Sequence, residues 1–243
     1  MSLNFDEKGK PIVSYGKRII YVNDKPIPDG FTEFEAKGDQ QFQQIPDKNT
    51  ERSILYITAP SGSGKSYYTR EYISQYHKIY PKRDVFIFSS LEDDPTLDKL
   101  KYIKRIKVKQ QPFLTTDLSA VDFKDALCVF DDCDCLTDKL IKKQVFNVLN
   151  SILETGRHFN ISVVYTSHSA CAGIETKKIL NECHSITIFP KTAGNRILKY
   201  LLDSYFGFNK EEIANIKKIK TRWVTITKTF PQVIFTEDKI WIR

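Results

Sequence analysis

The 243-residue sequence lacks the features that mark a membrane or exported protein. No apolar run approaches the roughly 18 residues that a membrane-spanning helix needs. The first residues, from Met1 to Glu7, contain no basic stretch followed by an apolar one, and position 2 is not the glycine that myristoylation requires. We therefore expect a cytoplasmic protein with no membrane segment.

Cysteine is scarce and irregularly spaced. The five cysteines form an odd set, so reduced thiols are expected in a chain without a secretory signal. A zinc site built on Cys133 and Cys135 would need a second pair of ligands at the usual spacing, and none of His158, His168 and His184 supplies one. The sequence thus favours buried or incidental cysteines over a metal site.

An extreme composition is also absent. Hydrophobic residues make up 41% of the chain and charged residues 28%, which is typical of a soluble globular protein and excludes a disordered one. The 37 lysines and arginines outnumber the 30 aspartates and glutamates, so the formal net charge is +7. This balance favours a polyanionic partner.

The first fifty residues are polar and repeatedly interrupted by glycine and proline. Only Arg18–Val22 predicts a strand there, so we interpret residues 1–50 as an N-terminal appendage without a core of its own. From Ser53 onward short apolar segments alternate with helical ones, which is typical of an α/β fold with a mainly parallel central sheet. Residues 51–243 are therefore expected to form one domain.

The expected elements of that domain follow from apolar periodicity and from end signals. Strands are predicted at Ile54–Thr58, Val85–Ser89, Leu127–Asp131, Ile161–Thr166 and Ser185–Phe189, and helices at Lys65–Ile79, Asp138–Thr155, Lys177–Glu182, Arg196–Tyr205 and Lys210–Ile219. The helix that ends at Gly156 should be capped by Thr137. A small C-terminal β-meander, packed on the core, is predicted from three alternating segments, Trp223–Thr227, Val233–Thr236 and Lys239–Ile242.

A glycine-rich turn joins the first strand of this domain to its first helix. It reads Ala59-Pro60-Ser61-Gly62-Ser63-Gly64-Lys65-Ser66 and continues into Tyr67, with alanine where the usual pattern has its first glycine. In a P-loop the amides of such a turn and the helix N-terminus bind phosphates, the lysine reaches the terminal phosphates and the next hydroxyl binds Mg²⁺. The sequence therefore predicts that residues 61–67 bind a nucleotide, with Lys65 catalytic and Ser66 on the metal.

Two aspartates follow the apolar residues of the predicted strand Leu127–Asp131. A P-loop enzyme needs a carboxylate at a buried strand end to hold Mg²⁺, and hydrolysis needs a second group to polarise the attacking water. We predict that Asp131 binds Mg²⁺ and that Asp132 is the general base or positions the attacking water. Asp134 is the alternative to Asp132. The weaker interpretation is that these acids only cap the next helix. The predicted strand Val85–Ser89 and a long insertion separate this strand from the P-loop strand, which fits the additional-strand class of P-loop ATPases.

The predicted strand Ile161–Thr166 leads into Ser167 and His168. If it lies between the two strands just described, His168 comes close to the γ-phosphate as a sensor; the alternative is a strand-end histidine that bonds the backbone. Arg157 precedes this strand. It could reach the nucleotide of an adjacent subunit, or it could be a cation favoured by the helix dipole.

These motifs together resemble a known family. The P-loop, Val-Phe-Asp-Asp at 129–132 and Gly-Arg-His-Phe-Asn-Ile-Ser-Val-Val-Tyr-Thr-Ser-His at 156–168 are similar to the genome-packaging ATPases of large double-stranded DNA viruses and virophages, in the FtsK/HerA superfamily. The resemblance covers about Ser53 to Pro190. It implies that Arg157 is a trans-acting arginine finger, that His168 replaces a glutamine sensor, and that Asp132 replaces a glutamate.

The resemblance also implies partners and a location. They are ATP and Mg²⁺, a homo-oligomeric ring, double-stranded DNA and viral capsid proteins, in the host cytoplasm, in a virus factory or on the virion. Two other functions fit the same motifs: a nucleotide or nucleoside kinase, and an assembly protein that switches with bound nucleotide. Two basic clusters are either DNA contacts or solvated faces. The first contains Lys99, Lys101, Lys104, Arg105, Lys107 and Lys109, and the second Lys217, Lys218, Lys220 and Arg222.

Overall fold

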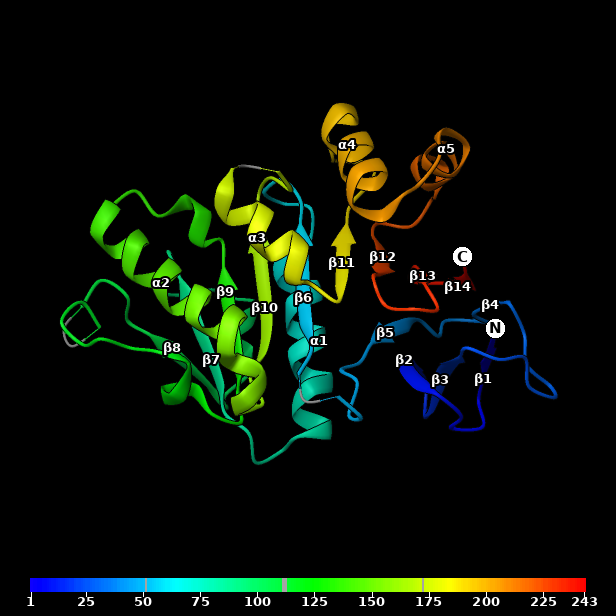
Figure 1. Cartoon of the computed structure of the whole chain (residues 1–243), viewed down its shortest axis with the longest axis horizontal. Coiled ribbons are helices and arrows are strands. Elements are labelled where there is room, and N and C mark those ends of the chain that lie inside the picture. Colours follow the sequence, from blue (N-terminus) through cyan, green and yellow to red (C-terminus); the bar gives the residue numbers. More distant parts are fainter. Residues whose placement is uncertain (51, 111–112, 172) are drawn as a thin grey trace.

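The computed structural model of the chain describes residues 1–50, 52–110, 113–171 and 173–243. Within these residues a ten-stranded sheet is covered by helices, and a four-stranded sheet lies beside it (Figure 1). The parallel part of the ten-stranded sheet confirms the predicted α/β fold. In spatial order the parallel strands are β11 (Ser185–Ile188), β6 (Ile54–Thr58), β10 (Ser162–Ser167), β9 (Leu127–Asp131), β7 (Val85–Ser89) and β8 (Ile103–Ile106).

The central strands β6, β10 and β9 are buried along their whole lengths, which explains why they are apolar and rich in β-branched residues. Strand β10 lies between β6 and β9, as the additional-strand arrangement requires. Strand β8 was not predicted. Its sequence, Ile-Lys-Arg-Ile, is basic and belongs to the first charged cluster, and it forms an end of the sheet.

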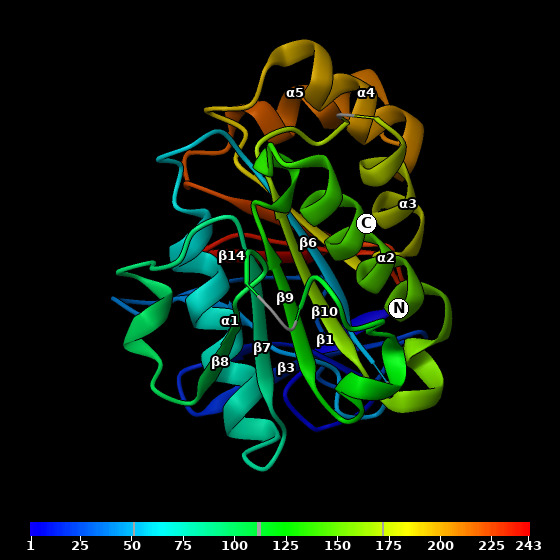
Figure 2. The same cartoon turned by 90° about the vertical axis from the view of Figure 1, so that its left-hand side faces the viewer.

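Helices cover both faces of the sheet. Figure 2 shows α1 on one side of it and α2 and α3 on the other. No helix in the described part of the chain is both long and apolar enough to cross a membrane. The helices are α1 (Lys65–Ile79), α2 (Lys139–Thr155), α3 (Ile174–Glu182), α4 (Asn195–Phe206) and α5 (Lys210–Lys218), with short 3₁₀ turns η1 (Leu97–Lys99), η2 (Ala120–Phe123), η3 (Cys133–Cys135) and η4 (Gly156–Phe159).

The predicted cap of α2 is wrong by one residue. The side chain of Asp138, rather than Thr137, accepts the backbone N–H groups of Leu140 and Ile141, at 2.8 and 3.0 Å. A carboxylate at this position also interacts favourably with the helix dipole.

The C-terminal strands form an antiparallel meander, as predicted, but they extend the main sheet instead of packing on it. Strand β12 (Val224–Thr227) pairs with β11, and β13 (Val233–Phe235) and β14 (Lys239–Ile242) follow. Strand β4 (Glu33–Glu35), from the N-terminal segment, pairs with β14 at this end of the sheet. One strand of the first fifty residues is therefore built into the main sheet.

The prediction of a single N-terminal strand is wrong. Strands β1 (Ser2–Asn4), β3 (Arg18–Asn23), β2 (Lys10–Tyr15) and β5 (Phe42–Gln44) form the second sheet, in that spatial order. Apolar side chains from these strands are buried in one cluster with residues of β6 and α1, so the segment shares a core with the rest of the chain. They are Leu3, Ile12, Val13, Ile20, Val22 and Phe42.

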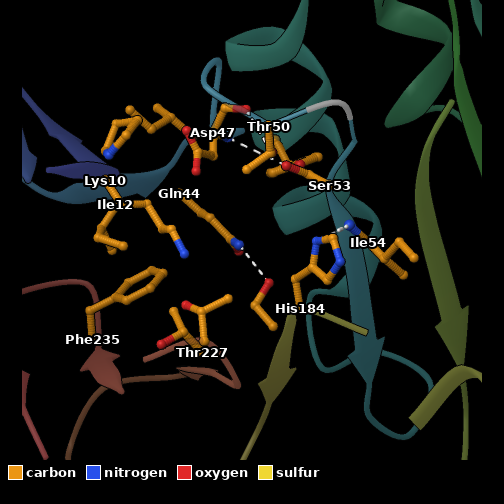
Figure 3. Close-up of a pocket in the computed structure, with 15 residues that line it drawn as sticks. Lys10, Ile12, Gln44, Asp47, Thr50, Ser53, Ile54, His184, Thr227 and Phe235 are labelled. Atoms are coloured by element: carbon orange, nitrogen blue, oxygen red, sulfur yellow. Dashed lines mark hydrogen bonds between the residues drawn. The ribbon is translucent and has the colours of Figure 1, made fainter. Parts of the chain in front are cut away.

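A cavity marks the junction of the two sheets (Figure 3). There Gln44 Nε2 donates a hydrogen bond to Ser185 Oγ at 2.8 Å, and Tyr68 OH on α1 donates to Gln44 Oε1 at 2.8 Å. Ile54 and His184, at the first residue of β6 and just before β11, line the cavity. Since the P-loop follows the opposite end of β6, this cavity is not the nucleotide site.

Candidate active site

The P-loop connects the buried strand β6 to α1. Gly62 and Gly64 have φ angles of 76° and 110°, in the left-handed region that favours glycine. Gly64 is also the N-cap of α1, so the turn delivers the chain directly to a helix N-terminus. A left-handed turn followed by a helix N-terminus is an anion-binding arrangement, because both present backbone N–H groups.

Lys65 connects this loop to the acidic strand end. Its side chain is 6% exposed, and Nζ donates a hydrogen bond to the carbonyl oxygen of Ala59 at 2.9 Å. The same nitrogen lies 3.6 Å from Asp132 Oδ1. The predicted catalytic lysine and the predicted water-activating carboxylate are therefore neighbours.

Asp131 ends β9 and is 2% exposed. Its two carboxylate oxygens accept hydrogen bonds from Thr166 Oγ1 at 3.0 Å and from Ser89 Oγ at 3.4 Å. Burial, together with the neighbouring charge of Asp132, raises the pKa of Asp131 to about 6. A buried carboxylate beside a second carboxylate gains from a bound cation, and Ser66 in the first turn of α1 offers a hydroxyl oxygen. These hard oxygen ligands fit Mg²⁺.

Thr166, at the end of β10, joins the two aspartates. Its Oγ1 accepts the backbone N–H of Asp132 at 2.9 Å and lies 3.0 Å from a carboxylate oxygen of each of Asp131 and Asp132. Asp132 has a φ of 46°, which is uncommon for a residue other than glycine and redirects the chain after β9. The sequence indicated a polar group at this strand end but not its contact with both acids, which depends on the β9–β10 register.

His168 lies beside the predicted base. Its Nε2 is 3.4 Å from Asp132 Oδ2, and its backbone N–H donates to Asp134 Oδ2 at 3.2 Å. Lys65 and His168 thus approach Asp132 from two sides, whereas the Asp134 carboxylate lies beside His168 and Cys135. This geometry favours Asp132 over Asp134 as the group that activates water.

Arg157 lies far from these residues. It belongs to η4, an exposed turn at the start of β10, whereas His168 follows the end of that strand. Because β10 is parallel to β6 and spans about 20 Å, Arg157 is at the opposite edge of the sheet from the P-loop of its own chain.

Two P-loop neighbours come from the C-terminal half of the chain. Ser63 Oγ is hydrogen-bonded to Thr192 Oγ1 at 3.0 Å, and the side chain of Arg222 lies 3.5 Å from where a Cβ on Gly64 would be. The sequence placed Arg222 in a basic cluster and gave no sign of this position, which results from the antiparallel pairing of β11 and β12.

Tyr67, the last residue of the predicted nucleotide-binding segment, lies at the surface. Its side chain is 57% exposed, and the Arg70 guanidinium is 4.6 Å from its ring centre.

Comparisons with known proteins show the family and the fold of the chain. No family model matches the chain. "Uncharacterized protein V3" of the Sputnik virophage is 43% identical over 190 residues, which are 77% of this chain and 76% of V3.

Solved structures are similar at lower identity. The cytoplasmic domain of the type VII secretion ATPase EccC from Thermomonospora curvata is 13% identical, with a TM-score of 0.56 over 89% of this chain and 30% of that one. The genome-packaging NTPase B204 of Sulfolobus turreted icosahedral virus 2, in complex with ATP-gammaS, is 13% identical, with a TM-score of 0.49 over 77% of this chain and 97% of that one. The likeness to EccC shows that the chain has the fold of a P-loop ATPase.

Proposed function

Because the chain belongs to the same family as protein V3 of the Sputnik virophage, we propose a viral role for it, as an ATP-hydrolysing motor that moves double-stranded DNA into a capsid. The observation that carries the proposal is the convergence of Lys65, Asp131, Asp132 and His168 at one edge of a P-loop ATPase sheet. The resemblance of the sequence motifs to genome-packaging ATPases supports the choice of DNA as the polymer. The protein would act in the host cytoplasm or in the virion, with capsid proteins as partners.

Each residue of the site has a role in hydrolysis. The loop from Ser61 to Ser66, followed by Tyr67, binds the phosphates, and Lys65 counters charge that develops on the terminal one. Asp131 and Ser66 would hold Mg²⁺, which neutralises phosphate charge when bound.

Asp132 orients the attacking water and accepts its proton. Its contacts with Lys65 and His168 support this role. Thr166 fixes the two carboxylates relative to each other. His168 touches the base and would report the state of the γ-phosphate to it.

Arg157 would complete the site of a neighbouring subunit. Its position before the amino end of β10, whereas the P-loop follows the carboxyl end of β6, supports action on a neighbouring subunit. A role as an arginine finger then requires an oligomer, which we propose is a ring.

The proposal is tested by ATP turnover with and without duplex DNA. We expect DNA to stimulate phosphate release, Lys65→Ala to abolish ATP binding and turnover, and Asp132→Asn to bind ATP but hydrolyse it at least a hundredfold more slowly. Asp134→Asn is the matched control and should retain most of the activity. Turnover that needs a phosphate acceptor, or that ignores DNA, contradicts the motor. A reversed result for the two aspartate variants contradicts the assignment of the base.

A further inference from the structure

Asp134 and Cys135, both on η3, lie next to the face of the His168 ring that points away from Asp132. One possible ligand atom of each of the three side chains lies within 4.8 Å of the other two. Cys135 Sγ is 3.1 Å and Asp134 Oδ1 is 4.0 Å from His168 Nδ1. In a tetrahedral zinc site with bonds of roughly 2.0–2.3 Å, the ligand atoms are roughly 3.3–3.6 Å apart. The observed spacing brackets these values, so small movements would place the three atoms on one ion.

Asp134 supplies a second, independent observation. Its Oδ1 is buried and has no hydrogen-bond partner among the described residues, while its Oδ2 accepts the backbone N–H of His168. A buried carboxylate oxygen without a partner is costly, and a cation at this place would remove the cost. Lys142 Nζ donates to the backbone oxygen of Asp134 at 3.0 Å, which holds the turn in position.

The orientation of His168 is the one that a metal ligand needs. Metal-binding histidines usually direct their second ring nitrogen to a carboxylate, which fixes the tautomer. Here His168 Nε2 faces Asp132 Oδ2 at 3.4 Å. With the ring proton on Nε2, the lone pair of Nδ1 faces Cys135 and Asp134.

We propose that Asp134, Cys135 and His168 bind Zn²⁺ and that this ion restrains ATP hydrolysis, an inference that rests on the proposed role of Asp132. The ion replaces the thiol proton of Cys135 and leaves a fourth position for water. Thiolate and imidazole ligands select zinc over the Mg²⁺ of the nucleotide site. A cation on Nδ1 makes Nε2–H a stronger donor to Asp132, whose carboxylate is then a weaker base toward water. Zinc should slow hydrolysis while ATP still binds.

Metal binding explains the surroundings of the Cys135 thiol better than a role in oxidation does. Partial burial and the carboxylates of Asp134 and Asp132 raise the pKa of Cys135, so the reactive thiolate is disfavoured. A bound metal ion stabilises the thiolate directly and overcomes this effect.

Binding is tested on the nucleotide-free protein with Co²⁺ as a probe. We expect a thiolate-to-cobalt charge-transfer absorption that added Zn²⁺ abolishes by competition. Cys135→Ser and Asp134→Asn should lose or strongly weaken it, and Cys171→Ser, which changes a cysteine outside the cluster, should keep it. Circular dichroism checks that the variants are folded. A cobalt spectrum that is the same in Cys135→Ser as in the parent overturns the site.

Regulation is tested by ATP turnover at fixed Mg²⁺ over a buffered Zn²⁺ series. Without zinc, Cys135→Ser should match the parent, and its half-inhibition should need at least tenfold more zinc. Equal zinc sensitivity in both proteins overturns the regulatory role. If the parent hydrolyses no ATP at all, the proposed function fails, and the cobalt experiment still decides whether the metal site exists.

Discussion

At the scale of single residues, Thr166 Oγ1 is the atom that holds the carboxylates of Asp131 and Asp132 in position. It has one hydrogen to donate and lies 3.0 Å from a carboxylate oxygen of Asp131 and of Asp132, so only one of them receives that proton at a time. Asp131 is almost fully buried, whereas the side chain of Asp132 is 22% exposed beside Lys65. These unequal surroundings suit a division of roles, in which one carboxylate holds a metal and the other activates water.

His184 should make the stability of the fold depend on pH. Burial, aided by the charges of Arg52, Lys10 and Lys228, lowers the pKa of His184 to about 4. The unfolded chain takes up the proton near pH 6.5, so between pH 6.5 and 4 it binds more protons than the native state, and acid favours unfolding. Since one pKa unit corresponds to about 1.4 kcal/mol, we expect His184→Gln to remove up to about 3 kcal/mol of the stability loss across this window.

The measurement is the free energy of unfolding from urea titrations at several pH values. Glutamine keeps an oxygen that can accept the Ile54 N–H, which donates to His184 Nδ1 at 3.4 Å (Figure 3). His158→Gln makes the same change at an exposed position and is the control. An unchanged profile in His184→Gln would show that the burial of this ring has no energetic consequence.

At the scale of elements, the strands and helices that are most buried were predicted most accurately from the sequence. Strands β6, β7 and β9 and helix α1 begin and end where predicted, because buried parallel strands are continuous apolar runs bounded by turn residues. Strand β8 was missed because it is short and basic at the sheet edge. Strands β1, β4 and β5 were missed because each has only three residues, and β2 because it contains Pro11. The P-loop and the acidic pair are local in sequence and could be predicted. The meeting of Cys135 with His168 could not, since it depends on strands β9 and β10 pairing.

The two basic clusters belong to elements with different surroundings. In β8, Lys104 Nζ is 2.7 Å from Asp84 Oδ2 and an Arg105 guanidinium nitrogen is 2.6 Å from Asp98 Oδ1, so acidic partners already neutralise both. Lys217 and Lys218 are exposed at the end of α5, on the side of the molecule to which β11 points (Figure 1). We therefore predict that DNA, if bound, contacts the second cluster rather than Lys104 and Arg105.

Salt titrations of duplex DNA binding test this difference. Each phosphate contact adds about 0.9 to the slope of log affinity against log salt, because binding releases counterions. We expect replacing Lys217 and Lys218 by glutamine to reduce the slope by up to about 2, and the same change at Lys104 and Arg105 to leave it nearly unaltered. The opposite ranking would place the DNA along β8.

At the scale of the whole molecule, the predicted catalytic residues His168 and Arg157 lie at opposite ends of β10. His168 follows its carboxyl end and lies beside Asp132, and Arg157 precedes its amino end, about 20 Å away. If Arg157 is an arginine finger, one chain presents the finger on one side and the P-loop on the other. Head-to-tail contacts of this kind close into a ring when the rotation between neighbouring subunits is a whole fraction of a turn.

Mixing two inactive variants tests whether Arg157 acts between subunits. Arg157→Ala should bind ATP nearly as well as the parent, since Lys65, Ser66 and Asp131 are intact, yet hydrolyse it roughly a thousandfold more slowly. Lys65→Ala keeps the arginine but not the phosphate site. When the two are combined under conditions of subunit exchange, some interfaces pair an intact Arg157 with an intact P-loop, so turnover should reappear. Exchange without recovery, or normal hydrolysis by Arg157→Ala alone, would show that Arg157 is a structural cation at the end of α2 and that each subunit hydrolyses ATP independently.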